Sequence, residues 1–384
     1  MKEQKYLYFN EDHESMREMA RDFANKTLAP IAAEIDRTET YPMEVVQMMA
    51  DMGLLGLKVP EEYGGCGLDM RSYVCVMEEI AKVSAVSTIF VSNANSLSTA
   101  PILLFGSEEQ KQTYLPQSCT GEKIIGFALT EPNAGSDAGS LTTRAVKDGD
   151  DYILNGRKCF ITLAHLASYM VVFAKTSPDK GVKGITAFIV DMKAPGVSLG
   201  KPEEKMGQRG IAVSDVILED VRVPASCVIG EVDKGFISAM QTLNVGRVGV
   251  AAMSLGIAQR ALDLAVEHTK NRVQFGKPLA QQQALRFMMA DMQTKLSAAR
   301  LLVYDAAYRM DQKDEDATMA ASMAKYYAAE AAKEIVDKAL QLHGGYGYSR
   351  EYEIERLYRD IRVNTIYEGS SQVQQIVIAG QLLK

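Results

Sequence analysis

The positions of hydrophobic residues divide the chain into three regions, and the first of these has helical spacing. HESMREMARDFANKTLAPIAAEI (13–35) places Met16, Met19 and Phe23 three and four residues apart, as on one face of a helix. Pro30 then interrupts the pattern, because proline has no amide hydrogen for a continuing helix. The turn-rich VPEEYGGCGLD precedes a second helical stretch, MRSYVCVMEEIAKVSAVSTIF. We therefore expect an N-terminal helical domain over residues 1–125.

The middle region consists of short runs of β-branched and aromatic residues. Three such runs are YMVVFAKT (169–176), GITAFIVDM (184–192) and VSDVILEDVRVP (213–224), each bounded by Gly, Pro, Asp or Lys. This composition and spacing predict antiparallel strands in a compact sheet or barrel. We expect a middle β-domain over residues 126–232.

The last region returns to helical spacing. QQQALRFMMADMQTKLSAARLLVYDAAYRM keeps apolar residues three and four positions apart, and its methionines are expected to form an adaptable part of the core. ATMAASMAKYYAAEAAKEIVDKALQL continues in the same way until HGGYGY, where glycine indicates a helix end. The fold class is therefore mainly α with a middle β-domain, and a C-terminal helical bundle is expected over residues 233–384.

Composition excludes several classes of protein. The chain has 384 residues, 47% hydrophobic and 24% charged, with a net charge of −7, which argues against a nucleic-acid partner. No uninterrupted apolar run approaches the roughly 18 residues of a membrane span, and MKEQKYLYFNEDHESM lacks the apolar stretch of a signal peptide. A cytoplasmic protein with no membrane span is expected.

The cysteines and histidines do not form a recognisable ligand set. Five cysteines and four histidines are dispersed singly along the chain, without the close spacing of a disulfide framework or a zinc site. No metal site is expected. The chemistry should therefore depend on an organic cofactor or on a single acid–base group.

Two short stretches are candidates for that chemistry. FALTEPNAGSDAGS (127–140) has the composition of a loop that brings backbone amides to a ligand, but also that of a solvated turn. It contains neither a Rossmann nor a P-loop signature. In TIYEGSSQ (365–372), Glu368 is either an exposed residue near the terminus or a desolvated base beside Tyr367. Composition alone leaves both alternatives open.

Five motifs resemble those of the acyl-CoA dehydrogenases, in order and spacing, from about residue 8 to the last residue. They are LTEPNAGSD, GRKCFITLA (156–164), NRVQFGKPL (271–279), QLHGGYGY (341–348) and RDIRVNTIYEGSSQVQ (359–374). The resemblance implies the acyl-CoA dehydrogenase fold, with an N-terminal helical domain, a β-barrel-like domain and a C-terminal four-helix bundle. It also implies noncovalently bound FAD.

The same resemblance makes Glu368 the catalytic base. In that role Glu368 removes the α-proton of an acyl-CoA while the flavin takes the β-hydrogen as hydride. The resemblance also implies that Tyr367 and Gly369 contact the substrate and that Ser370 and Gln372 contact the cofactor.

A second position supports this assignment. Some relatives carry the base on the helix that contains LNVGRVGV (243–250), immediately before an arginine. Here that position is Gly246, which cannot act as a base. Arg247 resembles the arginine that supports the active site. Asn244, a further expected substrate contact, stands where aspartate is common.

The resemblance also assigns flavin contacts. Phe160 occupies a position where tryptophan is frequent, Leu163 replaces the usual asparagine, and Cys159 is expected to be a packed thiol. Ser136 is expected to contact both flavin and substrate. The flavin contacts in the two middle-domain stretches are Phe127, Leu129, Thr130, Ser136, Phe160 and Thr162.

A third group resembles the residues that bind the adenine-dinucleotide end of FAD. In relatives these residues come from a neighbouring subunit, which implies a homotetramer built as a dimer of dimers. They are Arg272, Gln283, Gln341, Gly344 and Gly345.

The expected function is a FAD-dependent acyl-CoA dehydrogenase. QTLNVGRVGVAAMSLGIAQRALD and the ending VIAGQLL resemble the short-chain members, so the substrate is expected to be a short or modest-length acyl-CoA and its 2,3-enoyl-CoA. Electrons would be exchanged with an electron-transferring flavoprotein. The main alternative is an enoyl-CoA reductase of acrylyl- or arylacrylyl-CoA type, driven by that reduced flavoprotein. A flavin oxidase or monooxygenase of the same fold and a non-catalytic scaffold are further alternatives.

Overall fold

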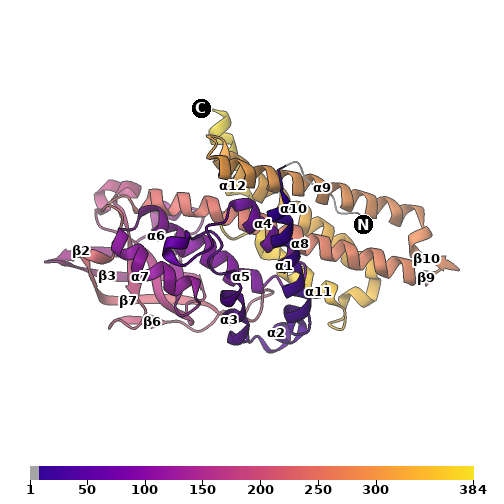
Figure 1. The fold of residues 1–384 in the computed structure, drawn as a ribbon, viewed down its shortest axis with the longest axis horizontal. Coiled ribbons are helices and arrows are strands. Elements are labelled where there is room, and N and C mark those ends of the chain that lie inside the picture. The colour runs from indigo at the N-terminus through magenta and orange to yellow at the C-terminus, as the bar shows by residue number, and fades with distance from the viewer. Residues whose placement is uncertain (1–7) are drawn as a thin grey trace.

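The computed structural model describes residues 8–384, so the first seven residues of the expected N-terminal domain lie outside it. Helices occupy both ends of the chain, and the sheet is formed by its middle part (Figure 1). The interruption predicted at Pro30 is confirmed, because α1 runs into a π-helical turn at Ala24–Leu28 and the next helix begins at Ala32. The N-terminal helices are α1 (Glu11–Phe23), α2 (Ala32–Thr38), α3 (Met43–Asp51), α4 (Met70–Ala81), α5 (Ser87–Ser92), α6 (Thr99–Phe105) and α7 (Glu108–Cys119).

The middle part forms one eight-stranded sheet in the order β6-β7-β3-β2-β4-β5-β8, with β1 paired to β4. Most neighbouring strands are antiparallel, as the sequence predicts, but β1 and β2 lie parallel to β4. The strands are β1 (Ile124–Ala128), β2 (Arg144–Asp148), β3 (Asp151–Thr162), β4 (Ala167–Lys175), β5 (Ile185–Asp191), β6 (Val197–Leu199), β7 (Val213–Pro224) and β8 (Val228–Ile229).

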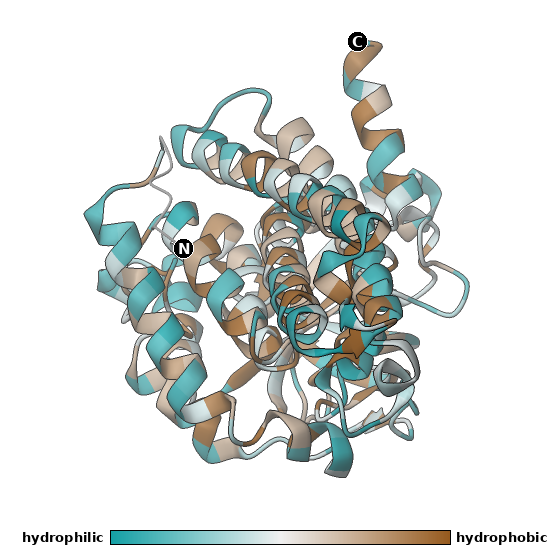
Figure 2. Ribbon diagram, turned by 90° about the vertical axis from the view of Figure 1, so that its right-hand side faces the viewer, coloured by the Kyte–Doolittle hydropathy of each residue, from teal (hydrophilic) through white to brown (hydrophobic). Residues whose placement is uncertain are grey.

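The C-terminal part is built on three long helices that lie side by side (Figure 1). The predicted glycine stop is confirmed, because α10 ends at His343 and is followed by Gly344, which has φ of +60°. The last helix, α12, projects away from the body of the molecule (Figure 2). The elements are α8 (Gly235–Asn271), β9 (Val273–Gln274), β10 (Lys277–Pro278), α9 (Gln283–Gln312), α10 (Ala317–His343), α11 (Glu353–Ile361) and α12 (Ser371–Leu382).

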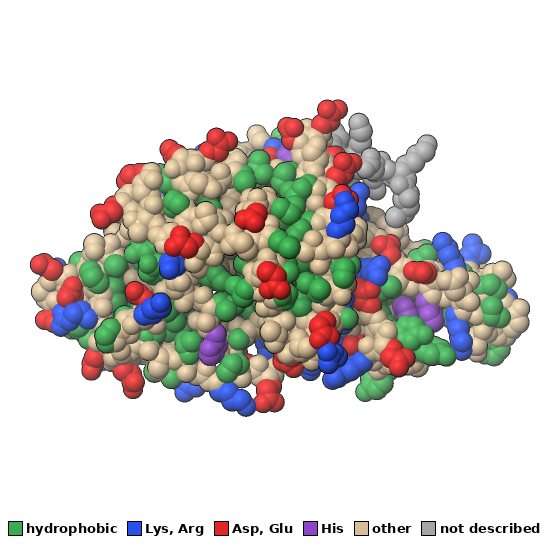
Figure 3. Space-filling view, turned by 60° about the horizontal axis from the view of Figure 1, so that its bottom comes forward, with side chains coloured by type: hydrophobic (Ala, Val, Ile, Leu, Met, Phe, Trp, Pro, Cys, Tyr) green, Lys and Arg blue, Asp and Glu red, His purple; other side chains and the backbone are tan. Residues whose placement is uncertain are grey.

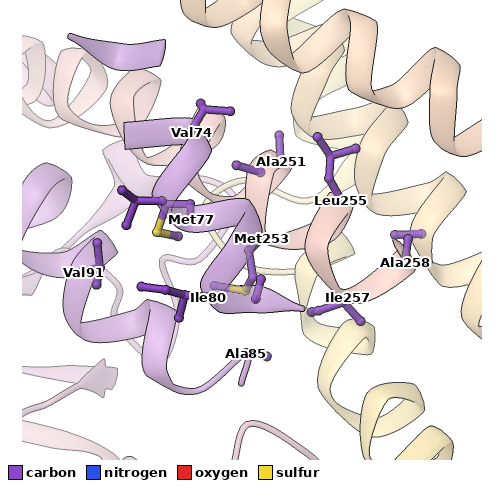
Figure 4. Close-up of a cluster of buried hydrophobic side chains, with 14 of the residues drawn as sticks. Val74, Met77, Ile80, Ala85, Val91, Ala251, Met253, Leu255, Ile257 and Ala258 are labelled. Atoms are coloured by element: carbon purple, nitrogen blue, oxygen red, sulfur yellow. The ribbon is translucent and has the colours of Figure 1, made fainter. Parts of the chain in front are cut away.

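The main core lies where α4 of the N-terminal part packs against α8 of the C-terminal part. Figure 4 shows Met77 and Ile80 of α4 meeting Met253 of α8, and each of these side chains is at most 2% exposed. The methionine-rich face of α9 also joins this core, as predicted, through Met292 and its apolar neighbours. Burial of these side chains fixes α8, which carries part of the candidate site, against the rest of the molecule.

Helix α8 is long and apolar enough to cross a membrane by length and composition, although the sequence analysis identified no such segment. Most of its apolar segment is buried inside the fold. A helix that is apolar on all sides is expected at the centre of a soluble core as well. Its burial between α4, α9 and α10 accounts for its composition.

The surface carries mixed charge. Acidic and basic side chains are interspersed on the face shown in Figure 3. Within residues 8–384, no group of three or more His, Cys, Asp or Glu side chains is arranged to hold a metal ion. All five cysteines are free thiols.

Candidate active site

Glu368 is carried by a loop that turns its side chain toward α8. The loop joins the short helical turn Arg362–Thr365 to α12, and both Glu368 and Gly369 have positive φ, +51° and +90°. A β-carbon added at Gly246 would stand 2.0 Å from Glu368 Oε2. The fold therefore brings together two residues that are far apart in the sequence, and only a position without a side chain leaves room for the carboxylate.

The environment of Glu368 suits proton transfer near neutral pH. Oε2 is buried and has no hydrogen-bond partner among residues 8–384. Burial raises the pKa of Glu368 to about 7, while the positive charges of Lys325 and Arg247 act in the opposite direction. A carboxyl group with such a pKa can both take and give a proton at pH 7.

The backbone of the loop is held by side chains from two helices. Lys325 Nζ of α10 donates to the carbonyl oxygen of Gly369 at 2.7 Å. Gln374 Nε2 of α12 donates to the same oxygen at 2.9 Å and to the carbonyl oxygen of Glu368 at 3.2 Å. Ser370 caps α12 by accepting from the backbone of Val373. These bonds stabilise a loop conformation that is unfavourable for glutamate.

Arg247 lies beside Glu368 and is tied to α10. Its Nη1 donates to Asn244 Oδ1 at 2.7 Å and to Ser322 Oγ at 3.4 Å, and Asn244 in turn donates to Thr318 Oγ1 at 3.1 Å. Nε of Arg247 is buried without a partner among the described residues. An aspartate at position 244 would add a negative charge here, so asparagine leaves the positive charge of Arg247 less compensated.

Two tyrosines face the same region. Tyr367, expected from the sequence, donates from its hydroxyl to Asn364 Oδ1 at 3.1 Å. Tyr73 of α4 was not expected; its side chain is buried, and its hydroxyl lies 2.3 Å from the position of a β-carbon at Gly249, without a hydrogen-bond partner in residues 8–384. Nothing in the sequence around Tyr73 distinguishes it from an ordinary core tyrosine.

The two predicted flavin stretches of the middle domain lie together. The amide of Cys159 on β3 donates to the carbonyl oxygen of Thr130 at 2.9 Å, and Lys158 Nζ donates to that of Leu129 at 3.2 Å. Phe160 is 65% exposed with φ of +57°, so its ring is presented outward. Thr162 ends the same strand.

A buried ion pair that sequence reasoning missed joins these stretches. Lys158 Nζ lies 2.8 Å from Glu131 Oε1, and both side chains are almost fully buried. Although burial opposes ionisation, Lys158 and hydrogen bonds from Thr142 and Thr143 lower the pKa of Glu131 to about 2. The pair therefore stays charged at neutral pH and fixes the loop that begins at Leu129.

Three further predicted cofactor contacts lie on separate elements. Phe127 lies on β1 with its ring packed 5.1 Å from that of Phe173. Ser136 is exposed in the following loop. Gln372 is exposed in the first turn of α12.

The predicted adenine-dinucleotide contacts gather at the far end of α8. Arg272 caps that helix, and its guanidinium lies 5.3 Å from the ring centroid of Tyr346. Arg272 is 26 positions beyond Gly246, which at the rise of a helix is about 39 Å. Within one chain these residues are therefore distant from Glu368. The others in this exposed group are Gln283, Gln341, Gly344 and Gly345.

The exposed features fit the two ends of the flavin that the resemblance implies. Phe160 offers an aromatic face for a planar ring. Gly344 and Gly345 have open space where a side chain would stand, and Arg272 adds a cation with bidentate geometry, which suits a pyrophosphate. The donors and the open space are therefore of the kinds that FAD needs.

Family profiles match most of the chain. The N-terminal, middle and C-terminal domains of acyl-CoA dehydrogenase match residues 10–122, 126–221 and 233–383.

Characterised relatives match along nearly the full length. The 3-(aryl)acrylate reductase of Clostridium sporogenes is 57% identical over 98% of this chain and 100% of its own. CarC, a subunit of the caffeyl-CoA reductase–Etf complex of Acetobacterium woodii, is 55% identical over 98% and 100%. The human mitochondrial short-chain specific acyl-CoA dehydrogenase is 48% identical over 97% and 90%.

Solved structures show the same fold. Butyryl-CoA dehydrogenase from Megasphaera elsdenii superimposes with a TM-score of 0.96 at 42% identity, covering 99% of this chain and 100% of that one. An acyl-CoA dehydrogenase from Bacillus anthracis complexed with FAD gives 0.91 at 33% identity, covering 98% and 67%. The fold class predicted from the sequence is confirmed.

Proposed function

The chain belongs to the acyl-CoA dehydrogenase family of flavin-dependent oxidoreductases, and we propose that it is an enoyl-CoA reductase of the arylacrylyl-CoA type. The observation that carries the proposal is the order of the relatives. The two named as aryl- or caffeyl-substrate reductases are 57% and 55% identical, whereas the short-chain dehydrogenase is 48% identical. This order favours the enoyl-CoA reductase, which the sequence left as the main alternative. It disfavours the dehydrogenation of a short acyl-CoA, which was the main expectation from the sequence.

In this proposal Glu368 is the proton donor. Reduction of a 2,3-enoyl-CoA adds a hydride at Cβ and a proton at Cα, and bound flavin in its two-electron-reduced form would supply the hydride. About half of the Glu368 carboxyl groups carry a proton at pH 7, because burial raises the pKa to about 7. Oε2 has no hydrogen-bond partner among the described residues and is free to face Cα. The positive φ of Glu368 and Gly369 turns the loop so that the side chain points into the site.

The remaining site residues have proposed binding roles. Ser136, Asn244, Arg247, Tyr367 and Gly369 are the proposed substrate contacts, and Arg247 and Asn244 are already positioned by their mutual hydrogen bond. Charge near the thioester oxygen stabilises the enolate-like transition state. FAD would be held by the proposed residues of the middle domain and the C-terminal loop. They are Phe127, Leu129, Thr130, Ser136, Phe160, Thr162, Ser370 and Gln372.

A neighbouring subunit completes the cofactor site in this proposal. The separation of about 39 Å along α8 between Gly246 and Arg272 keeps the second group of contacts away from Glu368 of the same chain. A homotetramer, as a dimer of dimers, would place Arg272 of one chain near the flavin of another. The proposed electron donor is an electron-transferring flavoprotein, in line with the CarC relative, which is a subunit of such a complex.

An anaerobic spectral titration of the purified flavoprotein tests the function. Reduced enzyme is mixed with cinnamoyl-CoA, crotonyl-CoA or acrylyl-CoA, and oxidised enzyme with 3-phenylpropionyl-CoA or butyryl-CoA. We expect cinnamoyl-CoA to reoxidise the flavin fastest.

Two other outcomes contradict the proposal. Fast bleaching by butyryl-CoA with no response to cinnamoyl-CoA would support the short-chain dehydrogenase, the second candidate, which has the same fold as butyryl-CoA dehydrogenase. Protein purified without bound flavin would support the scaffold alternative.

A further inference from the structure

Lys325 is a buried cation next to the proposed proton donor, and no motif considered in the sequence analysis includes it. Its side chain is 0% exposed, in the middle of the alanine-rich α10. Lysine is rarely buried in this way unless it is paired. No carboxylate lies within 4.0 Å of its nitrogen among residues 8–384, and its hydrogen bond is to the carbonyl oxygen of Gly369. The charge is therefore retained in the core without a direct ion pair.

The surroundings of Lys325 point to Glu368 as its electrostatic partner. Burial lowers the pKa of Lys325 to about 8, and Glu368 is the largest influence in the opposite direction. Arg247 also disfavours the charged lysine, and Glu330, on the same helix, favours it. Tyr73 and Tyr367 are the other titratable groups that face Glu368.

Lys325 also belongs to a row of polar side chains on one face of α10. Thr318, Ser322 and Lys325 are four and three residues apart, so they share that face. Thr318 accepts a hydrogen bond from Asn244, and Ser322 accepts one from Arg247. The row therefore connects α10 to both the α8 side and the Glu368 side of the site.

We propose that Lys325 is a positioning residue for Glu368, holding the Glu368–Gly369 turn through the Gly369 carbonyl and compensating the negative charge of the Glu368 carboxylate. The inference rests on the proposed function, because it takes Glu368 as the group that exchanges a proton with Cα. Two effects of Lys325 can be separated, the hydrogen bond that holds the turn and the positive charge near Glu368. Gln374 donates to the same carbonyl oxygen but carries no charge, so a change at Gln374 tests the hydrogen bond alone.

The test compares three variants of the flavoprotein. Lys325→Met and Gln374→Met each remove one donor to Gly369 O, but only the first removes a charge. Lys338→Met is the matched control, because Lys338 lies on the same helix and pairs with Asp291 and Glu334 near the surface. Each variant is assayed for enoyl-CoA reduction from pH 5.5 to 9, and thermal unfolding and the flavin spectrum show whether the fold is retained.

We expect Lys325→Met to lower kcat at least tenfold and to move the apparent pKa of kcat upward by about one unit. Gln374→Met should lower kcat without moving that pKa, and Lys338→Met should change neither. An unchanged pKa in Lys325→Met, with fold and flavin retained, would overturn the inference.

Two further results separate the possible failures. Loss of fold in Lys325→Met is checked with Lys325→Arg, which keeps the charge and should keep the parental pKa; a shifted pKa there contradicts the inference. A parent that reduces no enoyl-CoA contradicts the proposed function instead.

Discussion

Oε2 of Glu368 lies 2.0 Å from the point where a β-carbon of residue 246 would stand. A side chain at position 246 and the side chain of Glu368 therefore compete for one space. A carboxylate carried at position 246 of α8 would enter the same region. The glycine at position 246 is consequently a requirement of the Glu368 arrangement.

Gly246→Ala should impair proton transfer. The added methyl group must displace the Glu368 carboxylate, and a displacement of about 1 Å can cost about 100-fold in rate. Alanine otherwise favours a helix over glycine by about 1 kcal/mol, so the fold should be retained. The measurement is kcat with cinnamoyl-CoA, alongside thermal unfolding.

Gly380→Ala is the control for this prediction. Gly380 lies in α12 with nothing within 4 Å of the added carbon, so the rate should be parental. Equal rates for Gly246→Ala and the parent would contradict the placement of Glu368.

Glu368→Gln should lower turnover strongly while leaving flavin bound. The amide cannot exchange the proton with Cα, and loss of a general acid or base typically costs 10² to 10⁴-fold; we expect about 10³-fold in kcat. Glu351→Gln, a change at an exposed glutamate before α11, should have no effect. Turnover within tenfold of the parent would show that another group moves the proton.

The pH dependence should differ in sign between the two directions. Glu368 must be protonated to donate to Cα in reduction and ionised to accept in dehydrogenation. With a pKa of about 7, the rate of reduction should be constant below pH 7 and fall about tenfold per unit above it. The rate of dehydrogenation should rise up to pH 7 and then level. If the rates of reduction and dehydrogenation changed with pH in the same sense, Glu368 would not be the group that exchanges the proton.

The same pKa links pH to stability. The folded-state pKa of Glu368 is raised above its ordinary value of 4.5, so the folded protein binds this proton more tightly than the unfolded chain. The contribution is present below about pH 4.5 and is lost as pH rises through 7. We expect Tm of the parent to fall relative to that of Glu368→Gln between pH 5 and 8.

Much of the fold could be predicted from the hydrophobic pattern. The strand runs 169–176, 184–192 and 213–224 lie in β4, β5 and β7, because alternation and bounding turn residues are local signals. The parallel pairing of β1 with β4 has no local signal, since it depends on which edge remains open after the chain crosses the sheet.

The candidate site also contains residues that the sequence predicts and residues that only the folded structure reveals. Glu368 and Arg247 were identified through motifs, but Lys325, Tyr73 and the Glu131–Lys158 pair were not. Lys325 has one available signal, a single lysine among the alanines of ATMAASMAKYYAAEAA. A surface position explains such a lysine equally well, and only the packing of α10 against α8 and the Glu368 loop shows that it is buried.

Lys158→Met should destabilise the loop that begins at Leu129. Removing one partner of a buried ion pair leaves the other charge uncompensated, which costs about 3–5 kcal/mol. Glu131 would then be buried without Lys158, and the carbonyl of Leu129 would lose a donor. We expect a lower Tm and faster release of FAD, followed by its fluorescence. Lys147→Met, at an exposed position of β2, should leave both unchanged, and an unaffected Lys158→Met would contradict the structural role of the pair.

Two inactive variants should restore activity to each other if Arg272 serves a neighbouring subunit. Arg272→Ala should lose FAD affinity through the pyrophosphate contact, and Glu368→Gln should lose proton transfer. In a mixed dimer, the site with an intact Glu368 receives its Arg272 from the Glu368→Gln chain, so one site is complete. With random pairing about a quarter of all sites should work before selection, and purification through both tags raises this fraction by removing the unmixed oligomers. If Arg272 acted on the flavin of its own chain, every site of the mixture would carry one defect.

Differently tagged chains are coexpressed and purified through both tags, and kcat per flavin is measured. Activity no higher than that of the single variants would exclude the shared site.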